Sequence, residues 1–123
     1  MRPILDKLTE AYSVMAYAKG KIELHNRLIT TPCLIFPDAI DFPLLPSDPA
    51  ALDIEQFSTI IDKQPEVIIV GTGVAQLFIS EAVTAECNKR MIGVECMDTA
   101  AACRCFNILL SEGRYVAALL YMI

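Results

Sequence analysis

The stretch that most constrains the fold is residues 65–73, which read Pro-Glu-Val-Ile-Ile-Val-Gly-Thr-Gly. The four consecutive β-branched residues 67–70 are typical of a strand that is covered on both faces. Pro65 ends the helical pattern before it, and the Gly-Thr-Gly after it favours a tight turn at the end of the strand. We therefore expect a central strand in a sheet that carries helices on both sides.

The chain after residue 50 alternates between helical and strand-like patterns. It predicts three helices: one from the Asp53 cap to about Lys63, one near 80–90, and one over 100–112 that Thr99 caps. It predicts three strands, at 67–70, 92–97 and 115–122. The C-terminal half is then β-α-β-α-β. A right-handed crossover would make strands 67–70 and 93–97 parallel.

The N-terminal half favours short strands. Residues 12–36 alternate in a β-like pattern with turns at Lys19-Gly20 and Asn26-Arg27, which predicts hairpins. Residues 4–8 suggest a short helical turn or an arm without a chemical role.

A proline-rich loop follows the hairpins. Residues 37–49 contain four prolines, which excludes regular structure over most of the segment. The segment is nevertheless too apolar for a free tether, with Ile40, Phe42, Leu44 and Leu45. We expect it to pack across the body of the domain or, alternatively, against a partner.

Composition limits the classes of function. A chain of 123 residues, 54% of them hydrophobic, suits one domain over residues 1–123. The net charge of −5 without a basic cluster makes nucleic acid a poor partner. No apolar run approaches the roughly 20 residues of a membrane helix, so we expect no integral membrane protein. Residues 1–10 resemble neither a signal nor a transit peptide, which favours the cytoplasm.

The five cysteines favour reduced thiols, because the number is odd and no secretory signal is present. Cys103 and Cys105 lie two apart on a predicted helix and His25 is distant, so we expect no metal site and no cofactor. Cys96 and Cys103 lie near a helix start that could activate a thiol. Cys103 also lies on the apolar stripe of its helix, which favours a packed residue over a nucleophile.

Two strand ends predict a crevice at one edge of the sheet. Gly71-Thr72-Gly73 ends one strand and Asp98-Thr99 ends the next. The candidate pocket is lined by Gly71, Thr72, Gly73, Gln76, Asp98, Thr99, Arg104 and Asn107.

Each of these residues also has a structural explanation. The glycines could bind an anion through their N–H groups, or they could be needed only for a tight turn. Gln76 occupies the position where a dinucleotide-binding fingerprint needs its third glycine. Asp98 could act as a base, or cap a helix together with Thr99. Asn107 is unfavourable in mid-helix without a hydrogen bond to make. No set of residues matches a known catalytic arrangement, so an enzyme is not indicated.

The segments Gly-Thr-Gly-Val-Ala-Gln at 71–76, Gly-Val-Glu at 93–95 and Met-Asp-Thr-Ala-Ala-Ala-Cys-Arg at 97–104, with Asn107, resemble the Mth-type family of small domains of unknown function. That family looks to include an adipogenesis-associated Mth-domain protein and the third mitochondrial assembly factor of NADH:ubiquinone oxidoreductase. The resemblance implies a single three-layer α/β domain, with a mixed sheet of about five strands and a small extra β layer from the N-terminal hairpins.

Two functions follow as expectations. The first is a non-catalytic assembly-factor-like or protein-interaction domain, which holds a protein partner with its proline-rich loop and its crevice; the link to respiratory-complex assembly is by analogy. The alternative is a small enzyme or ligand-binding domain with an anion or metabolite in the pocket. A homo-oligomer that pairs through an edge strand or the apolar loop is compatible with both.

Overall fold

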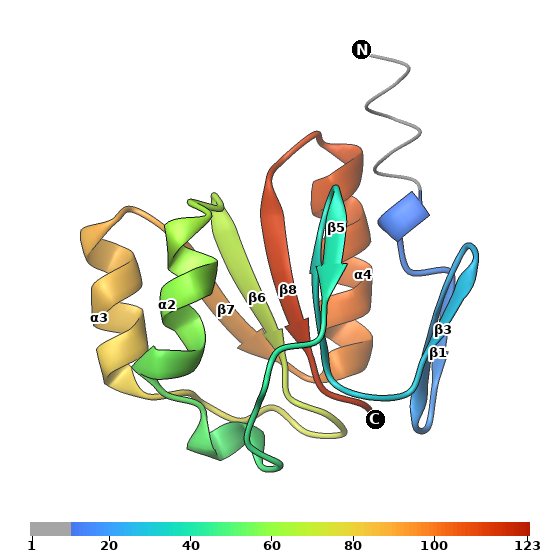
Figure 1. Cartoon of the computed structure of the whole chain (residues 1–123), viewed down its shortest axis with the longest axis horizontal. Helices are drawn as coiled ribbons and strands as arrows, with labels where there is room; N and C mark the ends of the chain where they lie inside the picture. The colour runs from blue at the N-terminus through green and yellow to red at the C-terminus, as the bar shows by residue number, and fades with distance from the viewer. Residues whose placement is uncertain (1–10) are drawn as a thin grey trace.

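A mixed five-stranded sheet forms the centre of the molecule in the computed structural model, which describes residues 11–123 (Figure 1). Its strand order is β5-β4-β8-β6-β7, with β6, β7 and β8 parallel and β4 antiparallel to both β8 and β5. The strands are β4 (Cys33–Phe36), β5 (Ala39–Asp41), β6 (Val67–Gly71), β7 (Gly93–Met97) and β8 (Val116–Leu120). The expected central strand is β6, which lies between β8 and β7 and is buried throughout.

Helices cover both faces of this sheet. The helices α2 (Ile54–Asp62) and α3 (Glu81–Lys89) pack on one face, and α4 (Thr99–Ser111) packs on the other (Figure 1). Asp53 and Gln56 make the predicted capping box at the start of α2. Because the Asp53 carboxylate and the Gln56 amide satisfy free N–H groups of the first turn, α2 begins where the sequence predicts.

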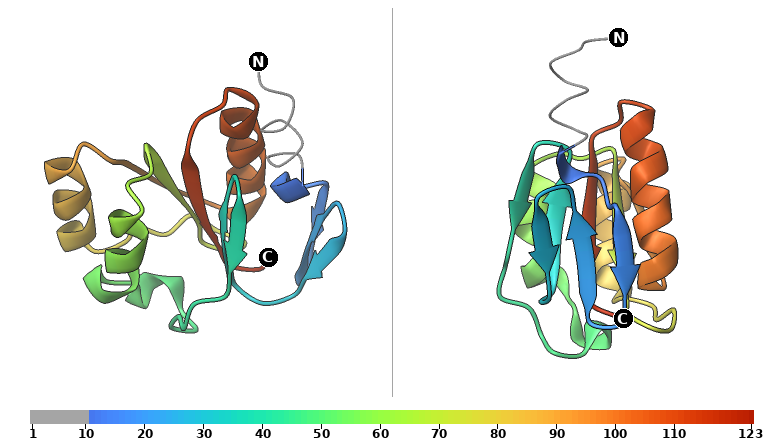
Figure 2. Two further views of the ribbon diagram at one scale, coloured as in Figure 1. Left: turned by 45° about the horizontal axis from the view of Figure 1, so that its top comes forward. Right: turned by 90° about the vertical axis from the view of Figure 1, so that its right-hand side faces the viewer.

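A small antiparallel sheet lies beside α4 (Figure 2). It consists of β1 (Ala16–Ala18), β2 (Lys21–Leu24) and β3 (Arg27–Ile29). Its inward side chains Ile22, Leu24 and Ile29 are buried in the same core as α4. This sheet is the additional β layer that the family resemblance implies.

The side chains of β6 divide the interior into two cores. Val67 and Ile69 pack with the α4 face, whereas Ile68 and Val70 pack with α2 and α3. Successive side chains of a strand point to opposite faces, so an unbroken apolar strand is needed to supply both cores at once.

Two expectations need adjustment, and a third is not tested. The proline-rich segment holds the strand β5 and the 3-10 helix η1 (Pro49–Ala51), because no proline falls inside residues 39–41 and Asp48 caps the turn. The cap of α4 is Asp98, and Thr99 is the first helical residue. The expected turn or arm at 4–8 lies outside the described residues.

Candidate functional site

The carboxyl ends of the parallel strands meet at one end of the molecule, together with the loops 42–48 and 72–80 and the C-terminal residues 121–123 (Figure 1). The C-terminal residues link the segments of this end through backbone hydrogen bonds. Tyr121 donates its backbone N–H to the Gly71 carbonyl at 2.9 Å. The Gly20 N–H donates to the Ile123 carbonyl, which brings the β1–β2 turn to the same end. The predicted crevice is therefore a meeting point of several segments.

Thr99 is the centre of this meeting point. Its hydroxyl donates to the Tyr121 carbonyl at 2.7 Å and accepts the Gly73 N–H at 2.8 Å. Its backbone N–H donates to the Gly73 carbonyl at 2.9 Å. Thr99 is fully buried, so these bonds form where water cannot replace them. One side chain thus joins the ends of β6 and β8 to the start of α4.

Thr72 folds the loop that follows β6. Its backbone N–H donates to the Met97 carbonyl at 2.9 Å, which continues the β6–β7 ladder. Its hydroxyl donates to the Ala75 carbonyl at 2.6 Å and accepts the Leu77 N–H at 3.1 Å. Gln76 donates from Nε2 to the Cys96 carbonyl at 3.0 Å. The loop therefore has a defined shape and lies along the end of β7.

Gly71 is required by close packing. A Cβ at this position would lie 3.0 Å from the Ala102 Cβ, from Leu120 Cδ2 and from Thr99 Oγ1. Gly73 is required by its backbone, because its φ of +97° is a conformation that side chains rarely adopt. Both glycines thus have a structural role where the ends of β6 and β8 meet the start of α4. We call this place the junction.

The N–H groups that could bind an anion are largely occupied by the chain. Those of Thr72 and Gly73 donate to Met97 and Thr99, and the Asp98 carboxylate accepts the Ala101 N–H at 2.9 Å. The arrangement satisfies its own polar groups, as expected for a folding junction.

Arg104 and Asn107 bond to the N-terminal segment and not to Gly73, Thr99 or Tyr121. Arg104 donates to the Tyr17 hydroxyl at 2.6 Å. The Asn107 amide accepts the Val14 N–H and donates to the Val14 carbonyl, both at 2.8 Å. The Asn107 bonds are the structural hydrogen bonds that its mid-helix position indicates. Both side chains attach the small sheet to α4, so the predicted set divides into two groups.

Burial opposes ionisation of the two thiols named above, Cys96 and Cys103. Cys103 is buried, and desolvation raises its pKa to about 11 although Arg104 opposes the shift. Desolvation also raises the pKa of Cys96. Because the thiolate is the reactive form, both shifts disfavour a nucleophilic role near neutral pH.

Within residues 11–123, His, Cys, Asp and Glu side chains form no group of three or more that could hold a metal ion. Within the same residues no helix is long and apolar enough to cross a membrane. A hollow of about 490 Å³ lies elsewhere, beside the turn between β2 and β3, and is lined by residues that include Met15, His25 and Leu28.

The feature that sequence reasoning underestimated is the exposure of three apolar side chains on the two loops of this end, Leu44, Val74 and Phe78, which we together call the apolar end. They are 96%, 80% and 81% exposed, and of the described large apolar residues only Met91 is comparably exposed. Leu44 lies on the loop 42–48, and the other two lie on the loop 72–80. The sequence signal for Val74 and Phe78 is that both are apolar residues inside an expected turn segment.

Several curated relatives of the chain are assembly factors. The chain is 32% identical over 120 residues to the NADH dehydrogenase [ubiquinone] 1 alpha subcomplex assembly factor 3 of Danio rerio, covering 95% of this chain and 68% of that protein. Its human counterpart is 25% identical, and the match covers 61% of its length. The chain thus spans about two thirds of the length of these relatives.

Solved structures confirm the fold and the family. An outer membrane protein from Bartonella henselae has a TM-score of 0.80 and 29% identity, with 94% of this chain and 98% of that chain covered. A Mth938-like domain from Bordetella pertussis has a TM-score of 0.68 and 28% identity, with coverages of 93% and 87%. The family described as "Protein of unknown function (DUF498/DUF598)" matches residues 14–121. The chain therefore belongs to the DUF498/DUF598 family, whose members include Mth-type domains and the mitochondrial assembly factor.

Proposed function

We propose that this chain is a non-catalytic protein-interaction domain of the assembly-factor kind, and that its partner covers the apolar end. The observation that carries the proposal is the exposure of Leu44, Val74 and Phe78 on two loops at one end of the domain. Covering a side chain of this type contributes on the order of 2 kcal/mol. Val74 and Phe78 share one loop, and exposed apolar patches on a small domain are characteristic of interaction surfaces.

The junction beneath has a supporting role in this proposal. Gly71, Thr72, Gly73 and Thr99 hold the loop 72–80 in one conformation, and Tyr121 holds the other loop by donating its hydroxyl to the Pro46 carbonyl at 2.8 Å. Preorganised loops lose less conformational entropy when a partner binds. Residues that the sequence assigns to a pocket would then act by positioning a protein surface.

The relationship to the assembly factors suggests the class of partner. We propose that the chain works in the cytoplasm on a subunit of a respiratory NADH dehydrogenase during assembly. Because similarity of fold does not by itself carry function, the identity of the partner is tested directly.

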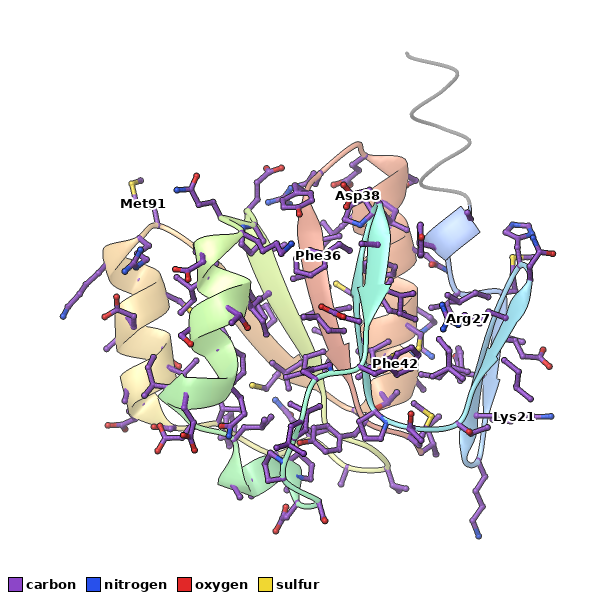
Figure 3. The ribbon with its side chains drawn as sticks, viewed as in Figure 1. Lys21, Arg27, Phe36, Asp38, Phe42 and Met91 are labelled. Carbon is purple, nitrogen blue, oxygen red and sulfur yellow. The ribbon has the colours of Figure 1, made fainter. Side chains whose placement is uncertain are left out.

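Co-purification of the tagged full-length chain from its native cells tests the proposal. We expect a respiratory or membrane-biogenesis subunit to be enriched with the wild type and with Met91→Asp, and to be lost with Leu44→Asp/Phe78→Asp. Met91 is the matched control because it is 92% exposed and lies at the opposite end (Figure 3). Enrichment of no such subunit would refute the assignment to respiratory assembly.

A second variant tests the pocket alternative. Asp98→Asn keeps an oxygen that can cap α4 but removes the carboxylate. Turnover of a defined metabolite by the wild type, abolished in Asp98→Asn without loss of the fold, would overturn the non-catalytic proposal.

A further inference from the structure

We propose that the outer edge of β7 pairs with the same edge of a second copy of this chain, antiparallel and about a two-fold axis at Val94. The two five-stranded sheets then join into one continuous sheet. This dimer is independent of the proposed function. The direction of each backbone group of β7 and the side chains that the pairing brings together carry the proposal.

β7 has an open edge. It is the last strand of the five-stranded sheet, and within residues 11–123 it pairs with β6 alone (Figure 1). The Gly93 N–H and the Met97 carbonyl bond to the β6 side, at 3.2 Å and 2.9 Å. Backbone groups of successive strand residues point to opposite sides, so Glu95 also faces β6, whereas Val94 and Cys96 direct their N–H and carbonyl groups away from it.

The chain itself closes the two ends of this edge. The Ile92 N–H donates to the Cys87 carbonyl at 2.9 Å, and the Gln76 amide donates to the Cys96 carbonyl at 3.0 Å. The Ile92 carbonyl points away from β6, because the next N–H lies in the same trans peptide and points toward it. The groups without a hydrogen-bond partner in residues 11–123 are then the Ile92 carbonyl, both backbone groups of Val94 and the Cys96 N–H.

A two-fold axis at Val94 gives each of these groups a partner. The two Val94 residues exchange N–H and carbonyl bonds, and each Cys96 N–H donates to the Ile92 carbonyl of the second copy. The remaining bond that a Cys96–Ile92 pair could form would need the Ile92 N–H and the Cys96 carbonyl, which the chain already uses. The pairing therefore satisfies the free groups of the edge and breaks no bond of the single chain.

Other two-fold registers fit less well. An axis at Glu95 would place two Glu95 carboxylates opposite each other, which destabilises a pair of strands. It would also need the Cys96 carbonyl, which Gln76 occupies, and an axis at Cys96 needs the same group. With the axis at Val94, each Glu95 lies opposite Gly93 of the second copy instead. The residues of β7 carry no other charge, so no like charges meet along the new pair of strands.

The side chains agree with this register. Val94 is half-buried against the core of α2 and α3, so the axis brings two apolar side chains together on that face. Gly93 and Glu95 lie on the α4 face and are exposed. A Cβ at Gly93 would meet nothing closer than 3.5 Å, so the single chain does not require glycine there. Glycine inside a strand often marks the close approach of another backbone, which the pairing supplies.

Sedimentation of the full-length protein under reducing conditions tests for the dimer. We expect the mean mass to rise from that of one chain at about 1 µM toward that of two chains at about 0.5 mM, as for a small interface. Amide exchange at Val94 and Cys96 should slow over the same range of concentration. The mass of one chain across the whole range would overturn the proposal and leave the edge to a strand of a different protein.

Nuclear Overhauser effects in a mixture of labelled and unlabelled chains test the register. Gly93 and Glu95 of the second copy form a non-hydrogen-bonded pair, in which the two backbones lie closest. We therefore expect a strong intermolecular signal between their Hα atoms. A dimer whose intermolecular signals join two Glu95 residues, or lie outside β7, would overturn the axis at Val94.

Matched variants at position 93 test the charge argument. Gly93→Glu places a carboxylate opposite Glu95 of the second copy and should weaken the dimer roughly 10-fold at low salt, whereas Gly93→Lys should not weaken it. Both variants add a side chain at the same exposed position, so their single chains should be equally stable. Gly93→Glu/Glu95→Lys should restore association. Equal dimer affinities of Gly93→Glu and Gly93→Lys would contradict the proposed pairing.

Discussion

The inner and outer residues of the single loop after β6 have opposite environments. Thr72 and Gly73 are buried, and their N–H groups bond to Met97 and Thr99. Val74 and Phe78, a few residues later, are at least 80% exposed. The polar residues that look like a binding site thus form the folding junction, and the apolar residues that look like core are on the surface. Substitutions on the two sides should therefore separate stability from binding.

The largest loss of stability is expected for Thr99→Val. Valine keeps the shape of threonine but leaves the Gly73 N–H and the Tyr121 carbonyl without their partner in a fully buried position. We expect the free energy of unfolding to fall by about 3 kcal/mol, measured by urea titration. Thr99→Ser keeps the hydroxyl and should cost about 1 kcal/mol. Equal losses in the two variants would show that the methyl group, and not the hydrogen bonds, matters at this position.

A somewhat smaller loss is expected for Gly71→Ala. The added Cβ would lie 3.0 Å from Ala102, Leu120 and Thr99, which requires the core to shift and should cost about 2 kcal/mol. Gly93→Ala is the control, because its Cβ would meet nothing closer than Val67 Cγ2 at 3.5 Å. Thermal unfolding of both variants measures the difference. If Gly71→Ala were as stable as Gly93→Ala, the side chains around Gly71 would be packed less tightly than the 3.0 Å approaches indicate.

Asn107→Ala tests the second group of predicted site residues. It removes both hydrogen bonds to Val14, which are half-buried, and should cost about 1 to 2 kcal/mol. Amide hydrogen exchange should accelerate first in β1 and β2, because these bonds attach the small sheet to α4. Ser111→Ala, which removes only a bond within the exposed end of α4, should leave this exchange unchanged. Acceleration at β7 instead would indicate that Asn107 supports the junction.

The smallest effect on stability is expected for Leu44→Asp. The side chain is 96% exposed, so the free energy of unfolding should change by less than about 0.5 kcal/mol while partner binding is lost. Urea titration and co-purification of the same preparation check both parts. A large loss of stability would mean that Leu44 packs against the domain in solution.

Most of the fold is predictable because local and long-range signals agree. The apolar run at 67–70 becomes β6, the Asp53–Gln56 pattern starts α2, and Ser80 precedes α3 as the charges at its two ends suggest. The strand β5 is harder to predict, since it lies between Pro37 and Pro43 and is stabilised by pairing with β4, which lies next to it in the sheet. Prolines exclude regular structure only where they stand, and residues 39–41 between them can still form a ladder.

The meeting of the two strand ends is predictable, but the bonds made there are less so. The ends of β6 and β7 do meet, and Gly71, Thr72, Gly73, Asp98 and Thr99 gather there. The sequence does not reveal that Thr99 turns inward to the Tyr121 carbonyl and leaves the cap of α4 to Asp98. This arrangement depends on Tyr121, which follows β8 and lies twenty-two residues after Thr99. Long-range partners of this kind cannot be read from local spacing.

Site-specific photo-crosslinking in native cells tests the central claim most directly. A photoreactive amino acid is placed at position 44, at position 78 or, as the control, at position 91, and the adducts are identified by mass spectrometry. The account predicts that positions 44 and 78 capture the same partner protein and that position 91 does not. Capture of that partner from position 91 alone, or no protein adduct at 44 and 78, would contradict the assignment of the apolar end as the interaction surface.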